Sequence, residues 1–214
     1  MTNFIRMTTL FYIYDPMCSW CWGYRPVWDE IQQQLSSHVN VEYVAGGLAA
    51  DSSEPMPASQ QRMIQQHWHT IEHKLGTKFN HDFWRDNIPR RSTYNACRAV
   101  IAAKIQGLHI KMIDAIQRGY YLKAMNPSDS DILLKLAEEI AEDREVGLNI
   151  EKFKEDFISD ELELKLTKEI SLARQLSSQG FPSLVLSHQG QLKQLLIDYQ
   201  NAQATVSLIE ALLD

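Results

Sequence analysis

The alternation of apolar and polar residues divides the chain into two β-rich ends and a helical middle. Near the start, Thr8–Tyr14 is β-branched and aromatic and stops at Asp15-Pro16, which predicts a strand buried on both faces. Apolar positions then recur through Cys21–Leu35, with helical spacing from Val27 onward. Val39–Val44 alternates as a second strand that ends at Gly46-Gly47. A strand, a helix and a strand in this order predict a βαβ unit with parallel strands.

The middle of the chain has helical periodicity and no convincing strand pattern. From about Ala58 onward the pattern predicts helices over Ser59–Leu75, Thr93–Gln106, Ile110–Met125, Asp131–Glu145, Ile150–Ile158 and Leu162–Ser178. Ser92, Asn149 and Ser159 are the expected N-caps.

A hairpin and a last helix are expected after this stretch. Ser183–Ser187 and Gln191–Ile197 predict two antiparallel strands, and Ala202–Leu213 predicts an amphipathic helix. The order βαβ, helices, ββα predicts an α/β chain with a thioredoxin-like fold and a large all-helical insertion. Residues 1–55 and 179–214 then form a discontinuous thioredoxin-like domain, and residues 56–178 form the inserted helical domain.

Composition and charge narrow the class of protein. The 214 residues are 44% hydrophobic and 22% charged, which is typical of a globular protein. The net charge of −6 gives no electrostatic case for a nucleic acid or an anionic membrane as partner. The apolar run Leu10–Tyr14 is too short for a secretory signal, so we expect a cytoplasmic protein with reduced thiols.

Two of the three cysteines, Cys18 and Cys21, lie at the turn from the first strand into the first helix. Free N–H groups and the dipole of a helix N-terminus stabilise an anion, which favours a thiolate at Cys18. Cys21 follows about one turn later, close enough to form a disulfide with Cys18. We therefore expect Cys18 to attack a substrate disulfide and Cys21 to release the product from the mixed disulfide.

Other interpretations of the cysteines remain open at this level. The pair could be inert core residues, a structural disulfide, or half of a zinc site completed by His69 and His73 or by Cys97. A second Cys-x-x-Cys is absent from the sequence, so we expect redox chemistry and no metal site. Cys97 by itself is typical of a small buried residue.

Arg90-Arg91 is typical of a solvated surface pair, although two arginines before a helix could also hold an anion.

Two segments resemble the DsbA-like branch of the thioredoxin superfamily, and within it the FrnE-like group of cytosolic protein-disulfide oxidoreductases. They are Tyr14-Asp15-Pro16-Met17-Cys18-Ser19-Trp20-Cys21-Trp22-Gly23, followed by Pro26, and Gly180-Phe181-Pro182-Ser183. The stretch from Asp129-Ser130-Asp131-Ile132-Leu133 through Gly147-Leu148-Asn149 also looks like the helical domain of this family.

The resemblance implies a role for each of three residues. Cys18 is implied to be the nucleophile, Cys21 the resolving thiol, and Pro182 a cis proline beside the pair that leaves the preceding backbone free for an extended peptide or a glutathione-like substrate. It implies no cofactor other than the redox-active Cys18–Cys21 disulfide, with glutathione as a candidate co-substrate. Ser19-Trp20 differs from the Pro-His of strongly oxidising DsbA proteins, which implies weaker oxidising power.

The substrate contacts expected near the pair come from Met17, Ser19, Trp20 and Phe181. Trp22 and Met56 either extend this apolar rim or belong to the core.

The function predicted first is a thiol–disulfide oxidoreductase or protein-disulfide isomerase that uses the Cys-Ser-Trp-Cys pair on protein disulfides or glutathione. One alternative is a glutathione-dependent isomerase or transferase of the 2-hydroxychromene-2-carboxylate isomerase or kappa glutathione transferase type. In those enzymes serine is typical at the first cysteine position, so the presence of both thiols argues for redox exchange. A metal-binding or redox-sensing module is a further alternative.

Overall fold

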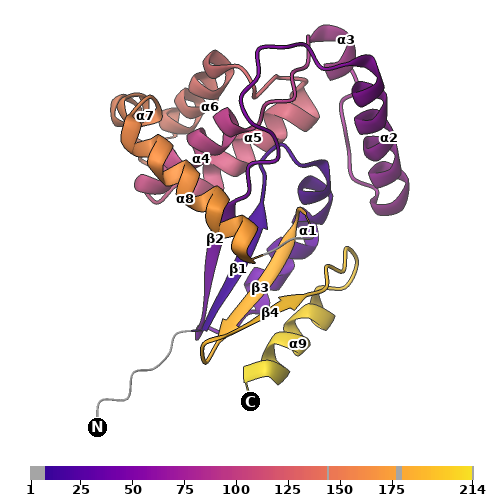
Figure 1. Cartoon of the computed structure of the whole chain (residues 1–214), viewed down its shortest axis with the longest axis vertical. Helices are drawn as coiled ribbons and strands as arrows, with labels where there is room; N and C mark the ends of the chain where they lie inside the picture. Colours follow the sequence, from indigo (N-terminus) through magenta and orange to yellow (C-terminus); the bar gives the residue numbers. More distant parts are fainter. Residues whose placement is uncertain (1–7, 144, 177–179, 214) are drawn as a thin grey trace.

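A computed structural model describes residues 8–143, 145–176 and 180–213 and contains a four-stranded sheet (Figure 1). Its strands, β1 (Thr8–Tyr14), β2 (Val39–Ala45), β3 (Ser183–His188) and β4 (Gln191–Leu195), lie in the order β2-β1-β3-β4. β1 and β2 are parallel and are joined by α1 (Ser19–Gln34), whereas β3 is antiparallel to both β1 and β4. The thioredoxin-like α/β fold, the βαβ unit and the hairpin are therefore confirmed, and α9 (Ala202–Leu213) follows β4.

The segment between β2 and β3 is helical, as the periodicity predicts. Its described helices are α2 (Ala58–Leu75), α3 (Phe83–Asp86), α4 (Tyr94–Ile105), α5 (His109–Lys123), α6 (Ser130–Glu142), α7 (Ile150–Phe157) and α8 (Asp160–Leu176). Figure 1 shows most of them gathered beyond the end of the sheet where β1 and β2 finish, with α8 returning along the sheet. The division into two domains at residues 56 and 178 stays a prediction.

Some of the predicted helix and strand ends are confirmed and others are wrong. Asn149 and Ser159 are N-caps as expected, because their side chains accept hydrogen bonds from the backbone N–H groups of Lys152 (3.0 Å) and Leu162 (3.2 Å). Ser92 is wrong as an N-cap, since Thr93 occupies that place in α4 and its hydroxyl bonds elsewhere. The four residues of α3 are too few to show periodicity, and β4 stops two residues before Ile197. Ser178, the predicted end of α8, lies outside the described residues.

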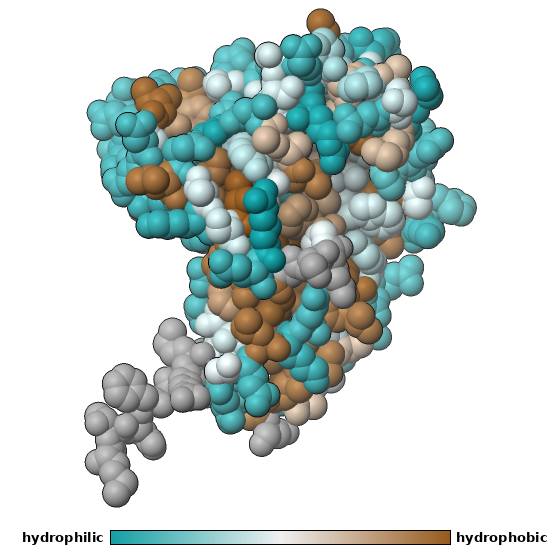
Figure 2. Space-filling model, viewed as in Figure 1, coloured by the Kyte–Doolittle hydropathy of each residue, from teal (hydrophilic) through white to brown (hydrophobic). Residues whose placement is uncertain are grey.

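Both faces of β1 are buried, which confirms the first prediction made from its sequence. Leu10, Tyr12 and Tyr14 pack in the larger hydrophobic cluster with Trp28 of α1, whereas Ile13 lies in a second cluster with Ala173 of α8. Figure 2 shows the resulting pattern on one face: hydrophilic side chains cover much of the helical part, and hydrophobic ones gather where it meets the sheet. The end of β1 is thus fixed from both sides, and the turn that carries the cysteines begins there.

Candidate active site

The turn after β1 is held by hydrogen bonds from the residues that lead into α1. The N–H of Cys18 donates to the carbonyl oxygen of Asp15 (3.0 Å), and the N–H of Met17 donates to the Asp15 carboxylate (2.8 Å). Cys18 has extended backbone angles and its carbonyl accepts from the N–H of Trp22 (3.1 Å), so it is the N-cap of α1. This is the position expected from the sequence, next to N–H groups that have no partner within the helix.

The two cysteines of the pair differ in access to solvent. Cys18 is 7% exposed and Cys21 is fully buried behind it, and both are free thiols in this structure. Burial raises the pKa of the Cys21 thiol well above its ordinary value, and the hydrogen bond and charge of Cys18 raise it further. Cys21 is therefore a protonated thiol at neutral pH, whereas Cys18 faces the pocket described below.

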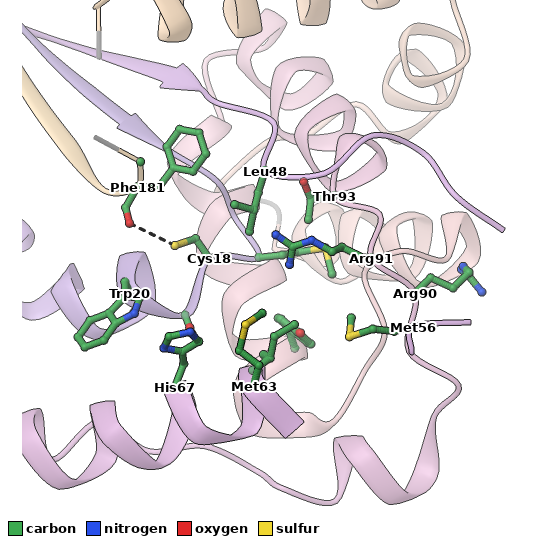
Figure 3. Close-up of a pocket in the computed structure, with 15 residues that line it drawn as sticks. Cys18, Trp20, Leu48, Met56, Met63, His67, Arg90, Arg91, Thr93 and Phe181 are labelled. Carbon is green, nitrogen blue, oxygen red and sulfur yellow. Dashed lines mark hydrogen bonds between the residues drawn. The ribbon is translucent and has the colours of Figure 1, made fainter. Parts of the chain in front are cut away.

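Pro182 lies at the start of β3, and the peptide bond between Phe181 and Pro182 is cis, as the resemblance implies. The Cys18 thiol donates a hydrogen bond to the carbonyl oxygen of Phe181 at 3.6 Å (Figure 3). The loop before β3 therefore meets the N-terminus of α1 at the reactive sulfur. Pro182 itself is buried.

Gly46, which follows β2, makes room for the Phe181 ring. A Cβ atom at Gly46 would collide with the outer carbons of that ring.

We expect Gly46→Ala to push the Phe181 ring and its loop away from Cys18. Disulfide-exchange activity should then fall, with a loss in the free energy of unfolding of about 1–3 kcal/mol, as for other overpacked sites. Activity assays and urea denaturation measure the two effects. In the double variant Gly46→Ala/Phe181→Leu the smaller side chain should restore activity, and a double variant as inactive as Gly46→Ala would contradict this explanation.

A pocket of about 260 Å³ opens beside Cys18 (Figure 3). The structure brings all four predicted contact residues to its wall, namely Met17, Ser19, Trp20 and Phe181. Cys21 and Pro182 are not part of the wall. Of the two residues left undecided, Met56 lines the pocket, whereas Trp22 stacks on Tyr121 (5.6 Å between ring centres).

Sequence reasoning missed most of the pocket wall that the helical segment supplies. The additional wall residues are Leu48, Met63, Ile64, His67, Arg90, Arg91, Thr93, Tyr120 and Gly180. Of these, Gly180 belongs to the second motif quoted from the sequence, and Arg90-Arg91 were expected to be a solvated surface pair. That expectation is wrong because both arginine side chains are half-buried. Arg90 is paired with Asp129. Arg91 extends toward Leu48 and has no acidic partner within ion-pair distance among the described residues (Figure 3).

Asp15 forms a buried hydrogen-bond network that sequence reasoning also missed. Its carboxylate accepts from the N–H of Leu48 (2.7 Å), the hydroxyl of Thr93 (2.7 Å) and the thiol of Cys97 (3.7 Å), besides the N–H of Met17. Burial raises the pKa of Asp15, and these donors oppose the rise. Cys97 is buried as predicted and donates to this network. The network connects the cysteine turn to α4 and to the segment after β2.

The zinc arrangement considered for the cysteine pair is not found among the described residues. Across that part of the chain, the group of side chains close enough to hold a metal ion consists of His69, Glu72 and His81. It contains neither a cysteine nor His73. In the same part of the chain, no helix is long and apolar enough to cross a membrane.

The sheet, the dithiol at the start of α1 and the cis proline facing it define a protein with the architecture of a thiol–disulfide oxidoreductase. A family model described as thioredoxin matches residues 11–206 of this chain. The chain belongs to the thioredoxin family, in its DsbA-like branch. Membership in the FrnE-like group stays a prediction.

Solved structures support this placement. A proposed protein disulfide isomerase from Nitrosomonas europaea is 28% identical, with a TM-score of 0.83 over 97% of this chain and 98% of the other. The cytosolic disulfide reductase DsbM from Pseudomonas aeruginosa is 24% identical, with a TM-score of 0.75 over 96% and 98% of the two chains. The structure of DsbM with GSH is 25% identical, with a TM-score of 0.74 over 96% of this chain and 98% of the other. A search of curated proteins found no match.

Proposed function

We propose that this chain is a cytosolic thiol–disulfide oxidoreductase or isomerase that reacts through Cys18 and Cys21, with glutathione as its small-thiol partner. One observation carries the proposal: a thiol at a helix N-cap lines a pocket, and a second thiol lies buried behind it within hydrogen-bond reach. This difference in access supports Cys18 as the nucleophile and Cys21 as the resolving thiol.

The reaction transfers two electrons in two exchange steps. The Cys18 thiolate attacks one sulfur of a substrate disulfide, the substrate S–S bond breaks, and the departing thiolate takes up a proton. Cys21 then loses its proton and attacks the Cys18 sulfur, which releases the second substrate thiol and leaves a Cys18–Cys21 disulfide. Two molecules of glutathione reverse these steps, restore the dithiol and leave as glutathione disulfide. Because the pKa of Cys21 is raised, the second step should accelerate as the pH rises above neutrality.

The pocket supports a substrate of the size and charge of glutathione. Glutathione is a tripeptide thiol with two carboxylates, and Arg91 places a cation on the pocket wall that no described acidic group neutralises. Apolar contacts from Met17 and Met56 suit its aliphatic part or a peptide side chain. The match to DsbM, whose structure was determined with GSH and whose name describes a cytosolic reductase, points the same way.

Arg91→Gln should weaken glutathione binding, because it removes the charge that pairs with a carboxylate. A hydrogen bond to a charged group contributes about 1.5–3 kcal/mol, so the KM for glutathione should rise roughly 10- to 100-fold while kcat changes little. Steady-state kinetics with varied glutathione and a fixed concentration of a disulfide substrate measure both constants. Arg62→Gln, on the exposed side of α2, is the control and should leave KM unchanged. An unchanged KM in Arg91→Gln would remove Arg91 from the site.

The proposed function is tested by three assays on the unmodified protein: insulin reduction with glutathione, refolding of scrambled ribonuclease, and conjugation of a small electrophile to glutathione. Disulfide activity in either of the first two supports the proposal and shows whether reduction or isomerisation dominates. Turnover of the electrophile alone, kept in Cys21→Ala, would instead identify a glutathione-dependent transferase or isomerase.

A further inference from the structure

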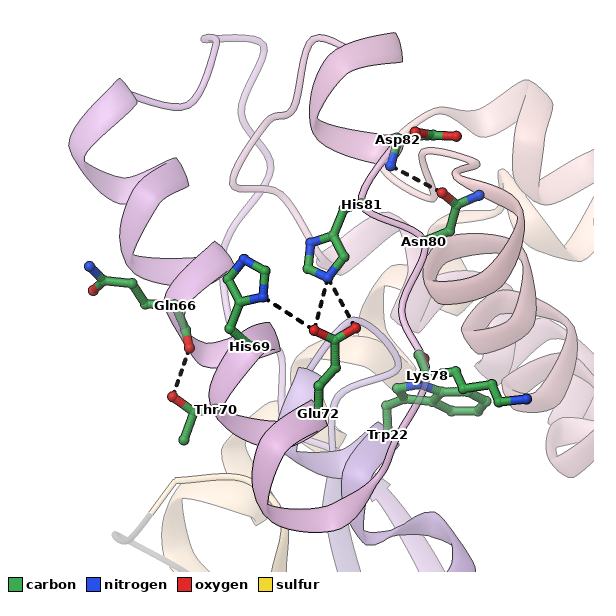
Figure 4. Close-up of polar contacts among 9 residues, drawn as sticks. All are labelled: Trp22, Gln66, His69, Thr70, Glu72, Lys78, Asn80, His81 and Asp82. Atoms are coloured by element: carbon green, nitrogen blue, oxygen red, sulfur yellow. Dashed lines mark hydrogen bonds and ion pairs between the residues drawn. The ribbon is translucent and has the colours of Figure 1, made fainter.

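Three side chains with metal-binding atoms meet on the outer side of α2, away from the cysteine pocket. His69 and Glu72 lie one turn apart on α2, and His81 reaches them from the segment after that helix (Figure 4). Nδ1 of His69 is 3.2 Å from Oε2 of Glu72, and Nε2 of His81 is 3.0 Å from both carboxylate oxygens. The three ligand atoms all lie within 4.8 Å of one another.

These separations are close to those that a tetrahedral metal ion requires. Zinc binds histidine nitrogen and carboxylate oxygen at about 2.0–2.2 Å, which places neighbouring ligand atoms of a tetrahedron about 3.3 Å apart. Two of the three pairs already have this spacing. The imidazole rings of His69 and His81 are stacked, with centres 4.5 Å apart and planes at 14°, so both nitrogens approach the same carboxylate from one side.

The surrounding structure holds His81 in place while leaving the site open to solvent. The neighbouring Asn80 is fixed to α5 by two hydrogen bonds. Its backbone N–H donates to the carbonyl oxygen of Tyr121 (2.6 Å), and its side-chain amide donates to the carbonyl oxygen of Leu122 (3.3 Å). The His81 ring packs against the buried Trp68. The side chains of His69, Glu72 and His81 are 65%, 31% and 34% exposed, so an ion and a water ligand can enter.

We propose that His69, Glu72 and His81 form a binding site for a divalent transition-metal ion, with Zn²⁺ as the expected occupant. Two imidazoles and one carboxylate suit Zn²⁺ rather than Mg²⁺ or Ca²⁺, which prefer sites made of oxygen ligands. Three protein ligands leave a fourth position for water or a small anion. The bound ion would join α2 to the segment after it. That segment also contacts α1, because the indole N–H of Trp22, next to Cys21, donates to the carbonyl oxygen of Lys78 (3.1 Å; Figure 4).

The site is tested by zinc titration of the untagged full-length chain in competition with a chromophoric chelator. Because the cysteine pair can also bind zinc, the titration is repeated in the variant Cys18→Ser/Cys21→Ser. We expect one Zn²⁺ per chain in both proteins. His81→Ala and Glu72→Gln should each lower the affinity by about 100-fold or more, since residues that only orient metal ligands already contribute 10- to 100-fold. His73→Ala, on the same helix but outside the cluster, should leave it unchanged.

Two further measurements separate the alternatives. Co²⁺ bound to Cys18→Ser/Cys21→Ser should give the absorption of a four-coordinate nitrogen and oxygen site without a thiolate band. Thermal unfolding without metal should show that Glu72→Gln, which keeps the size of the side chain, is folded like the parent. Zinc binding that disappears in the double serine variant, or that is weakened equally by His73→Ala, would overturn the proposal. So would failure of the parent to bind one equivalent. None of these readouts depends on the redox function.

Discussion

Replacement of Cys18 by alanine should reduce disulfide-exchange activity by about 10³-fold or more, the scale of loss when other enzymes lose their nucleophile. Cys18 is the thiol of the pair that lines the pocket, at the N-cap of α1 and 3.6 Å from the Phe181 carbonyl oxygen. Cys21 cannot take over, because it is fully buried and its raised pKa keeps it protonated. Insulin reduction and turnover of glutathione disulfide measure the loss.

Cys21→Ala is the matched control for this variant. It keeps the Cys18 nucleophile, so it should react once with glutathione disulfide and then remain as a mixed disulfide that mass spectrometry identifies at Cys18. The double variant Cys21→Ala/Cys97→Ala should give the same product, since Cys97 lies in the Asp15 network and not in the pocket wall. A mixed disulfide that forms as readily in Cys18→Ala would mean that the roles of the two cysteines are assigned wrongly.

Asp15→Ala should lower the free energy of unfolding by about 3 kcal/mol or more, because each buried donor left without an acceptor costs about 1–3 kcal/mol. The affected donors are the N–H groups of Met17 and Leu48, the hydroxyl of Thr93 and the thiol of Cys97. Asp15→Asn keeps one acceptor oxygen, and its loss should be about 1–3 kcal/mol. Activity should fall in both variants, since Met17 and Leu48 line the pocket beside Cys18. Urea denaturation followed by tryptophan fluorescence measures the stability.

The pH dependence of these variants tests whether the buried carboxylate itself is responsible. Burial raises the pKa of Asp15 in the folded protein above its ordinary value of 3.8. As the pH falls, the Asp15 carboxylate is therefore protonated in the folded state before it is protonated in the unfolded state. Between the folded pKa and 3.8, this proton uptake increases the free energy of unfolding of the parent. The stability difference between the parent and Asp15→Asn should widen on acidification within this window. Asp131→Asn, an exposed carboxylate in the first turn of α6, is the control and should change stability by less than about 1 kcal/mol at any pH. A constant difference for Asp15→Asn would contradict the explanation.

Much of the fold and the reactive pair could be predicted from local sequence. The β-branched run of β1 specifies a strand buried on both faces, and the alternation in β2 specifies a strand, although its last three residues are all buried. The periodicity of the middle segment specifies helices. Cys18 and Cys21 lie at a strand-to-helix turn, a position that follows from the order of neighbouring residues. The cis peptide bond at Pro182 followed from resemblance to a family and not from the local pattern.

The sequence by itself determined which residues carry the chemistry: two thiols one turn apart at the start of a helix, and a proline before a strand. Only the tertiary structure decided what surrounds them. It directs Arg91 into the pocket and Trp22 away from it, brings Thr93 and Cys97 to Asp15, and places His81 against His69 and Glu72. The physical reason is that periodicity records which face of an element is apolar, whereas these contacts join segments far apart in the chain and depend on how whole elements pack.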